Sequence, residues 1–361
     1  MLNRKEFLKK MAAFSAATTL TGLYSFQCTP RKADETAETN RLLTFDLHCH
    51  PGQFFWKGVE GYKGDDGVVK TINEMNEGGL TGGFISMVSD MLVLKRTDTG
   101  IMPARKFEPG EAWKDMERQL AVITGLMQTL NAHHGLKVSD LTKDESSNVA
   151  FYLACEGGDF IEDDLEKVDQ IYESGIRSIQ LVHYTPNNIG DLQTHDAIHG
   201  GLSDIGKEVV RRMNNLGMVI DVAHASFETV KSIAEVTEYP VILSHSILKM
   251  EENRPISARA ITIEHAKMVA ETGGVIGAWP SGFNRNFDEF VENILRLIDV
   301  AGIDHVGLGT DMDSNFQPVM NSYLQLPDWI AALKSKGLTE EETAKVAGGN
   351  AFRVLEAVLK N

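Results

Sequence analysis

The chain has 361 residues, 42% of them hydrophobic and 24% charged, which is enough to bury one large core. Its formal net charge is −16, from 51 acidic and 35 basic side chains. A surface this acidic repels phosphate backbones, so we do not expect the protein to bind nucleic acid. The cysteines Cys28, Cys49 and Cys155 form no closely spaced pair of the kind that marks a structural zinc or redox motif.

Residues 1–28 are typical of an export signal. Residues 2–10, LNRKEFLKK, are basic, and residues 11–26 are small and apolar but too few to span a membrane. The segment RKEFLK at 4–9 resembles a relaxed twin-arginine signal. We therefore predict export to the bacterial periplasm or cell envelope.

Two interpretations of Cys28 stay open. It could accept a lipid that anchors the protein to a membrane, although Phe26 and Gln27 depart from the small residues usual before such a cysteine. The alternative is a signal that is cleaved nearby without lipid attachment. Residues 29–41 are polar and are predicted to be a flexible linker.

Residues 42–361 are predicted to form a single catalytic domain in which strands and helices alternate. The apolar, β-branched runs expected as strands are 42–50, 82–89, 148–157, 178–185, 218–225, 241–246, 274–281 and 305–313. Helical periodicity covers 111–134, 162–174, 203–216 and 338–360, with Ser203 or Asp204 as an N-cap and Gly217 as a stop.

This alternation of about eight units favours an α/β fold of the (β/α)₈ TIM-barrel type. An open, doubly wound sheet is the alternative, for which we would expect a glycine-rich phosphate loop after the first strand. The sequence there is DLHCHPG, which is not such a loop.

Histidines and carboxylates occur at the ends of successive predicted strands. These residues are His48, His50, Glu156, His183, His224, His245 and Asp311. A single buried histidine is usually a core residue, but barrel enzymes build their active sites at the carboxyl ends of the strands. Several such residues at equivalent positions therefore predict a metal centre.

The first predicted metal site uses His48 and His50. They lie two residues apart on a strand, so both imidazoles face the barrel axis and can reach one ion. Asp46 shares that face and either orients a ligand or packs at the barrel floor. Glu156 could bridge two ions.

His224 and His245 suit a second metal, since neutral imidazole is a common zinc ligand. Asp311 can contact a metal and accept a proton from the attacking water. His183 could hydrogen-bond a developing oxyanion, and Arg254 could bind a substrate carboxylate. The other histidines are interpreted as structural or surface residues: His133, His134, His195, His199, His265 and His305.

Several motifs, in this order, resemble the membrane (renal) dipeptidase family of metallopeptidases. They are EGG, GIRSIQLVHYTPNN, GLSDIGKEVVRRMNNLGMVIDVAHAS, SHS, HVGLGTDMD and GGNAFRVL, and they span most of residues 42–357. The resemblance implies a (β/α)₈ barrel with two zinc ions that cleaves dipeptides, often with a D-residue at the C-terminal position. It also implies a homodimer.

The resemblance assigns roles to individual residues. It implies His48 as a ligand of the first metal, Glu156 as the bridging carboxylate, and His224 and His245 as ligands of the second. It further implies His183 as a substrate contact, Arg254 as the carboxylate-binding arginine and Asp311 as the acid near the bridging water.

Two positions depart from the family pattern. His50 stands where the family usually has an aspartate, which removes a negative charge from the site and resembles the wider amidohydrolase superfamily. The loop between His245 and Arg254 also differs, and Arg259 is the alternative carboxylate-binding residue.

These features predict a dipeptidase that depends on two divalent ions, expected to be zinc. Glu156, His183 and Asp311 are its predicted catalytic residues. One alternative is another amidohydrolase reaction, such as hydrolysis of an N-acyl amino acid or a lactam. A second alternative is an exported, non-catalytic binding lipoprotein on a degenerate barrel, which would have lost metal ligands.

Overall fold

The computed structural model describes residues 42–97, 100–141 and 148–360. The predicted export signal, Cys28 and the polar linker lie outside these residues, so they and the domain boundaries at 28 and 41 stay predictions. Within the described ranges, none of the helices is both long and apolar enough to cross a membrane.

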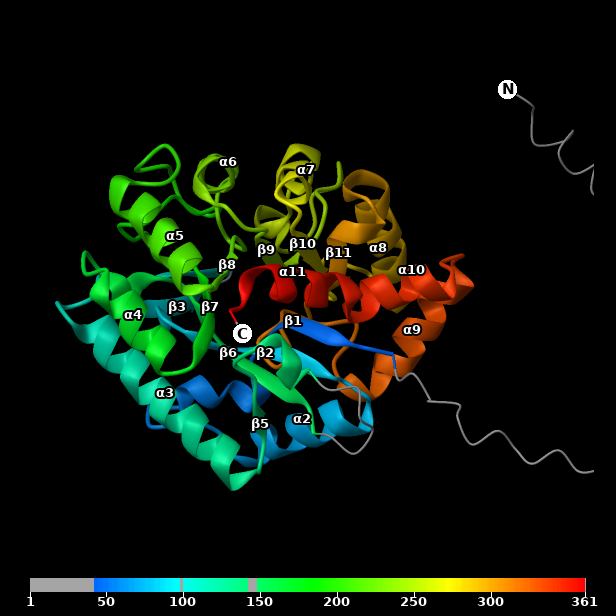
Figure 1. Ribbon diagram of the computed structural model, residues 1–361, viewed down its shortest axis with the longest axis horizontal. Coiled ribbons are helices and arrows are strands. Elements are labelled where there is room, and N and C mark those ends of the chain that lie inside the picture. Colours follow the sequence, from blue (N-terminus) through cyan, green and yellow to red (C-terminus); the bar gives the residue numbers. More distant parts are fainter. Residues whose placement is uncertain (1–41, 98–99, 142–147, 361) are drawn as a thin grey trace, which may run out of the picture. The chain divides into compact units, whose positions relative to one another are not determined.

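Eight parallel strands close into a barrel (Figure 1). In chain order they are β1 (Phe45–Cys49), β2 (Gly82–Val88), β6 (Ala150–Glu156), β7 (Ile176–Gln180), β8 (Val219–Asp221), β9 (Ile242–Ser246), β10 (Val275–Ala278) and β11 (Val306–Leu308). Successive strands of this series pair in parallel, and β11 returns to pair with β1. The predicted (β/α)₈ barrel is confirmed. Seven of its eight strands lie within predicted segments, and β7 begins two residues before the segment predicted for it at 178–185.

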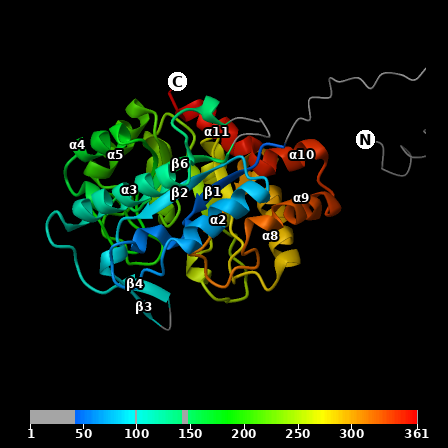
Figure 2. The same cartoon turned by 90° about the horizontal axis from the view of Figure 1, so that it is seen from below.

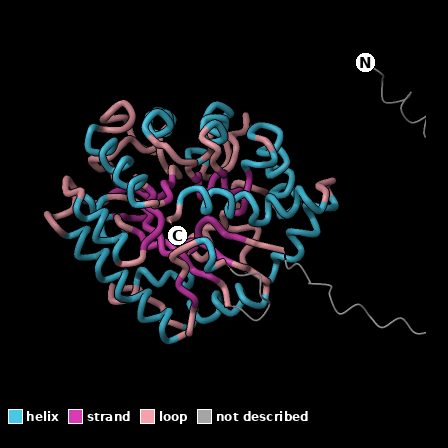
Figure 3. Tube along the Cα trace, viewed as in Figure 1, coloured by secondary structure: helices cyan, strands magenta, loops and turns pink. Residues whose placement is uncertain are grey.

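The helices form an outer layer around the strands (Figure 3). They are α2 (Asp66–Glu77), α3 (Glu111–Thr129), α4 (Glu166–Glu173), α5 (Asp204–Leu216), α6 (Phe227–Val236), α7 (Ile263–Glu271), α8 (Phe287–Ala301), α9 (Leu326–Ser335), α10 (Glu340–Ala344) and α11 (Asn350–Val358). Helix α5 has the predicted limits: the Ser203 side chain accepts from Gly206 N, and Gly217 ends the helix with φ 79°.

The structure corrects the predicted helix at 111–134. Helix α3 ends at Thr129, Asn131 takes a left-handed backbone conformation with φ 49°, and β5 (His133–His134) then pairs with β6 beside the barrel. A hairpin of β3 (Leu94–Thr97) and β4 (Gly100–Pro103) was not predicted, and Figure 2 shows it standing away from the barrel. Its strands are largely exposed, so they lack the burial pattern on which sequence prediction relies.

A compact apolar core fills the inside of the barrel. Its members come from strands around the ring and from α11, the helix that crosses in front of the barrel in Figure 1, and they include Leu43, Phe45, Leu47, Phe84, Tyr152, Val219, Ile242, Val275, Ala351, Val354, Leu355 and Val358. Asn350 at the start of α11 donates to the carbonyl oxygens of Ile303 and Val306, at 2.8 Å each. This end of the barrel is thereby closed, and the polar strand ends lie at the other.

Candidate metal centre

The carboxyl ends of four strands bring five buried side chains to one place. His48 lies on β1 and His50 follows it, Glu156 ends β6, and His245 lies on β9. His224 follows β8 in a left-handed conformation, with φ 65°. All five are at most 4% exposed, so they form an interior cluster.

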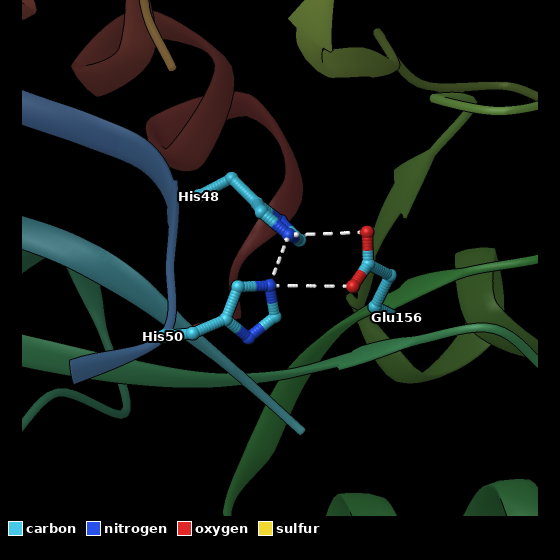
Figure 4. A group of neighbouring side chains, drawn as sticks. All are labelled: His48, His50 and Glu156. Atoms are coloured by element: carbon cyan, nitrogen blue, oxygen red, sulfur yellow. Dashed lines mark hydrogen bonds and ion pairs between the residues drawn. The ribbon is translucent and has the colours of Figure 1, made fainter. Parts of the chain in front are cut away.

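His48, His50 and Glu156 form the first group (Figure 4). The Nε2 atoms of His48 and His50 lie 3.3 Å from Glu156 Oε1 and Oε2, respectively. The same two nitrogens are 3.0 Å from each other. Ligand atoms from all three residues therefore lie within reach of one metal ion.

His224, His245 and the same Glu156 form the second group. Glu156 Oε1 lies 3.4 Å from His224 Nε2 and 3.8 Å from His245 Nε2. The two nitrogens are 3.2 Å apart. Glu156 thus belongs to both groups, which is the position that a bridging carboxylate would take.

The donor set fits two divalent cations. Within each pair two buried imidazole nitrogens point at each other, and a cation bound between them would stabilise this arrangement. Imidazole nitrogen and carboxylate oxygen are ligand atoms that zinc favours. In two of the four rings the opposite nitrogen is engaged elsewhere: His50 Nδ1 meets Ser86 O at 2.8 Å, and His245 Nδ1 meets Ser244 Oγ at 3.0 Å. Such partners leave Nε2 free as the ligand atom. His224 Nδ1 has no hydrogen-bond partner among the described residues.

The protonation states also suit metal ligands. Burial lowers the pKa of His224 and His245 well below the usual value, which favours neutral imidazoles. Burial by itself would raise the pKa of Glu156, but the charges of His183 and His48 and the hydrogen bonds it accepts hold it well below normal. The second group therefore offers an ionised carboxylate beside two neutral imidazoles, those of His224 and His245.

Asp311 lies at the edge of this cluster. Its Oδ1 is 3.5 Å from His50 Nε2, and its backbone has a left-handed φ of 52°. Burial, together with the negative charge of Glu156, raises the pKa of Asp311 to about 8. A buried carboxyl that titrates near neutrality is suited to carry a proton.

His183 also joins the cluster. Its Nε2 is 3.4 Å from Glu156 Oε1, and its Nδ1 is 2.6 Å from Asp90 Oδ1. Burial by itself would lower the pKa of His183, but the charges of Asp90 and Glu156 raise it to about 9. The two carboxylates therefore favour the protonated form of the ring.

The structure does not bring Arg254 into the cluster. Its guanidinium pairs with Glu252 at 3.1 Å and with Glu289 at 3.0 Å. The prediction that Arg254 binds a substrate carboxylate is therefore wrong, because its guanidinium is already paired with these two carboxylates.

Arg259, the alternative, lies at the centre instead. It is 3% exposed, its Nη2 is 3.3 Å from His245 Nε2, and its Nη1 donates to Gln193. Its guanidinium lies 5.9 Å from the ring centre of Trp279, and its Nε has no hydrogen-bond partner in the described chain. A buried guanidinium with a free donor is the feature expected for binding an anion.

The prediction for Asp46 resolves into a structural role. The carboxylate of Asp46 accepts hydrogen bonds from His48 N, from Thr310 and from Tyr323 Oη. These bonds tie the strand end that carries His48 to Thr310 and Tyr323. Cys49 and Cys155 are buried free thiols and not a disulfide.

The sequence analysis missed Asp90, which is fully buried against His183. The signal was present: Asp90 follows β2 closely, and acidic residues at strand ends were the criterion used for the other site residues. The predicted strand ended at residue 89, one position short.

Comparisons with known proteins agree with this geometry. The family model described as membrane dipeptidase (peptidase family M19) matches residues 36–361. An uncharacterized dipeptidase of Schizosaccharomyces pombe is 29% identical over 251 residues, covering 66% of this chain and 60% of that protein. Dipeptidase aclJ of Aspergillus oryzae is 31% identical over 195 residues, covering 51% of this chain and 46% of that protein. The aligned part is thus less than two thirds of either relative.

Solved structures share the fold. The probable dipeptidase PvdM of Pseudomonas aeruginosa superposes with a TM-score of 0.73 at 20% identity, covering 88% of this chain and 96% of that one. A metallopeptidase of Rhodobacter sphaeroides, solved with a phosphinate mimic of the dipeptide L-Ala-D-Ala, gives a TM-score of 0.71 at 20% identity, with 88% and 99% covered.

Proposed function

Because the chain belongs to the membrane dipeptidase family of metallopeptidases, we propose that it hydrolyses dipeptides at the cluster around Glu156. The observation that carries this proposal is the sharing of one carboxylate by two histidine pairs, with Arg259 beside the second pair. We propose zinc as the metal, with His48, His50, Glu156, His224 and His245 holding two ions.

Bound divalent cations lower the pKa of water and polarise a carbonyl oxygen. Around them, the residues of the chain bind the substrate and move protons. Arg259 holds the terminal carboxylate of the dipeptide through charge-assisted hydrogen bonds. His183 Nε2 donates to the carbonyl oxygen as negative charge develops on it.

Asp311 is the proposed proton carrier. Its carboxylate takes the proton of the attacking water at Oδ1 and passes it to the nitrogen of the leaving amine. Burial raises the pKa of this carboxyl, so it binds a proton more readily than a solvated carboxylate does, which suits it to accept the proton of the water.

Arg259 also accounts for a preference for very short peptides. A carboxylate bound at Arg259, beside the ligand His245, leaves little chain between it and the scissile bond. We include dipeptides with a C-terminal D-residue among the proposed substrates, since the R. sphaeroides relative was solved with a mimic of L-Ala-D-Ala.

N-acyl amino acids and lactams are the competing substrates, because they too present an amide near a carboxylate. A non-catalytic binding protein is less well supported, since both groups of metal ligands are complete.

The test compares protein stripped of metal with protein reloaded with zinc on L,L-dipeptides, L,D-dipeptides, N-acyl amino acids and lactams. We expect a dipeptide to be the best substrate and stripping to lower its hydrolysis about 100-fold or more. Equal rates with and without metal would contradict the proposal. A higher kcat/KM on N-acyl amino acids or lactams would assign the alternative reaction.

Export through residues 1–28 and a lipid on Cys28 remain proposals, supported by the basic and apolar pattern of that segment. A homodimer is likewise proposed from the family resemblance alone.

A further inference from the structure

Asp90 is a buried acid that the mechanism above does not use. It lies just after β2, is fully buried, and sits 2.6 Å by its Oδ1 from His183 Nδ1. Its other oxygen, Oδ2, accepts from the backbone N–H of Tyr184 at 3.1 Å and of Thr185 at 2.9 Å. One carboxylate therefore holds both the ring of His183 and the chain that follows it.

This contact fixes which atom of the ring faces the metal centre. An ionised carboxylate only accepts hydrogen bonds, so His183 Nδ1 carries the proton that it donates to Asp90. The opposite atom, Nε2, lies 3.4 Å from Glu156 Oε1. Because the imidazole ring is rigid, holding Nδ1 at Asp90 also fixes the direction in which Nε2 points.

Neighbouring rings limit any rotation of His183. Its ring centre is 4.5 Å from that of Tyr184 and 4.5 Å from that of His224. A ring packed in this way keeps the orientation that its hydrogen bond selects. Asp90 therefore contacts His183, and His183 contacts the metal centre. In such an arrangement the buried acid orients the histidine and does not itself contact the substrate.

We propose that Asp90 is a positioning residue for amide hydrolysis: it holds His183 by Nδ1 so that Nε2 points at the oxygen on which negative charge develops. The inference rests on the proposed function and deepens it, because it assigns a role to a residue that does not touch the substrate. The competing explanation is structural, namely that Asp90 only ties residues 184–185 to the end of β2.

The Asp90→Asn variant separates these explanations. Its amide oxygen can still accept from the backbone of Tyr184 and Thr185, whereas the anionic acceptor for His183 Nδ1 is lost. Asp159→Asn is the matched control. Asp159 is a second buried acid nearby, but it is hydrogen-bonded to Ser89 Oγ at 2.5 Å and makes no hydrogen bond to His183.

The experiment is a double-mutant cycle with zinc-loaded Asp90→Asn, His183→Ala and the combined variant, measured on the best dipeptide. We expect Asp90→Asn to lower kcat about 100-fold with KM changed less than about threefold. In the His183→Ala background the same change should lower kcat less than about threefold, because there is no ring left to position. Asp159→Asn should retain most of the wild-type kcat.

Four readouts do not depend on activity. Zinc content and melting temperature of Asp90→Asn should match the wild type, while its affinity for a phosphinate dipeptide mimic should fall in parallel with kcat/KM. In wild-type protein labelled with ¹⁵N-histidine, NMR should show His183 protonated at Nδ1, which tests the contact even where the variant is unstable.

Three results would overturn the inference while the proposed function stands: an unchanged kcat in Asp90→Asn, an equal loss in both His183 backgrounds, or an unprotonated Nδ1. An equal loss in Asp159→Asn would do the same, because it would assign the effect to the charge of the pocket. A wild-type enzyme that hydrolyses no dipeptide would instead overturn the proposed function.

Discussion

Glu156 is the residue on which both halves of the metal centre depend. Its Oε1 lies 3.3 Å from His48 Nε2 in the first pair and 3.4 Å from His224 Nε2 in the second, and its charge would offset the cost of burying the two cations that we propose there. Each histidine, by contrast, belongs to one group only. Removing the carboxylate and removing a histidine should therefore have different effects on metal content.

We expect Glu156→Ala to lose both ions and His224→Ala to lose one, against roughly two zinc ions per chain in the wild type. Elemental analysis of dialysed protein measures this directly. His199→Ala, a change at an exposed histidine, is the control and should keep the wild-type content. Full metal content in Glu156→Ala would contradict the assignment of a shared ligand.

The two arginines give a second prediction. Replacing Arg259 by Met should raise KM for dipeptides about 10- to 100-fold, which corresponds to the loss of hydrogen bonds between charged groups. The matched change Arg254→Met should alter KM less than about threefold, because Arg254 pairs with Glu252 and Glu289. Steady-state kinetics decide the point, and a larger effect at Arg254 would restore the original prediction.

His265 on α7 predicts a dependence of stability on pH. Burial, together with the charge of Arg259, lowers its pKa from 6.5 to about 4. The folded state thus binds this proton less readily than the unfolded state. The free energy of unfolding is therefore unaffected by this group above pH 6.5 and decreases as the pH falls toward 4.

Replacing His265 by Gln removes this titration. The free energy of unfolding of the wild type, relative to the variant, should fall by about 3 kcal/mol between pH 7 and pH 4. Chemical denaturation of both proteins at a series of pH values measures the difference. A difference that is constant with pH would refute the prediction.

At the scale of elements, close contact between strands limits which side chains the barrel can hold. A Cβ atom added to Gly277 on β10 would lie 1.8 Å from the carbonyl oxygen of Ser244 on β9. The obstacle is backbone, so it cannot move aside without disturbing the strand pairing. In contrast, a Cβ at Gly125, on the exposed side of α3, meets nothing within 4 Å.

We therefore expect Gly277→Ala to destabilise the fold by about 2 kcal/mol or more. The matched change Gly125→Ala should stabilise it by about 0.5–1 kcal/mol, because alanine loses less backbone entropy in a helix. Urea denaturation of the two variants compares them directly. Equal effects would show that the contact at Ser244 does not limit the barrel.

Element prediction succeeded where burial leaves a periodic pattern. The strands of the barrel are buried on both faces and appear as short apolar runs bounded by polar residues, so each was predicted. The hairpin of β3 and β4 has exposed faces and left no such pattern. Helix α3 was predicted too long because the stop signal at Asn131 was overlooked: asparagine is, after glycine, the residue most often left-handed at a helix end.

At the scale of the whole molecule, residues 42–360 contain the barrel, its helical layer and the metal centre. Strand β1 begins at Phe45, after the predicted signal and linker. We expect protein lacking residues 1–41 to keep its melting temperature within about 2 °C, its zinc content and its kcat/KM. A melting temperature lowered well beyond this would show that the N-terminal segment contributes to the fold.

The sequence by itself determined the class of fold and the grouping of the five proposed metal ligands. Both follow from local rules: apolar runs predict strands, and the end of each strand in a parallel barrel faces the same opening. His48, His50, Glu156, His224 and His245 could therefore be grouped before any distance was known.

Only the tertiary structure decided between Arg254 and Arg259 and revealed Asp90. The two arginines lie five residues apart in one loop, and nothing local shows that Arg254 turns toward Glu252 and Glu289 while Arg259 reaches His245. Asp90 and His183 are 93 residues apart in the chain. Contacts of this kind depend on how loops fold over the barrel, and no spacing of residues along the sequence encodes that path.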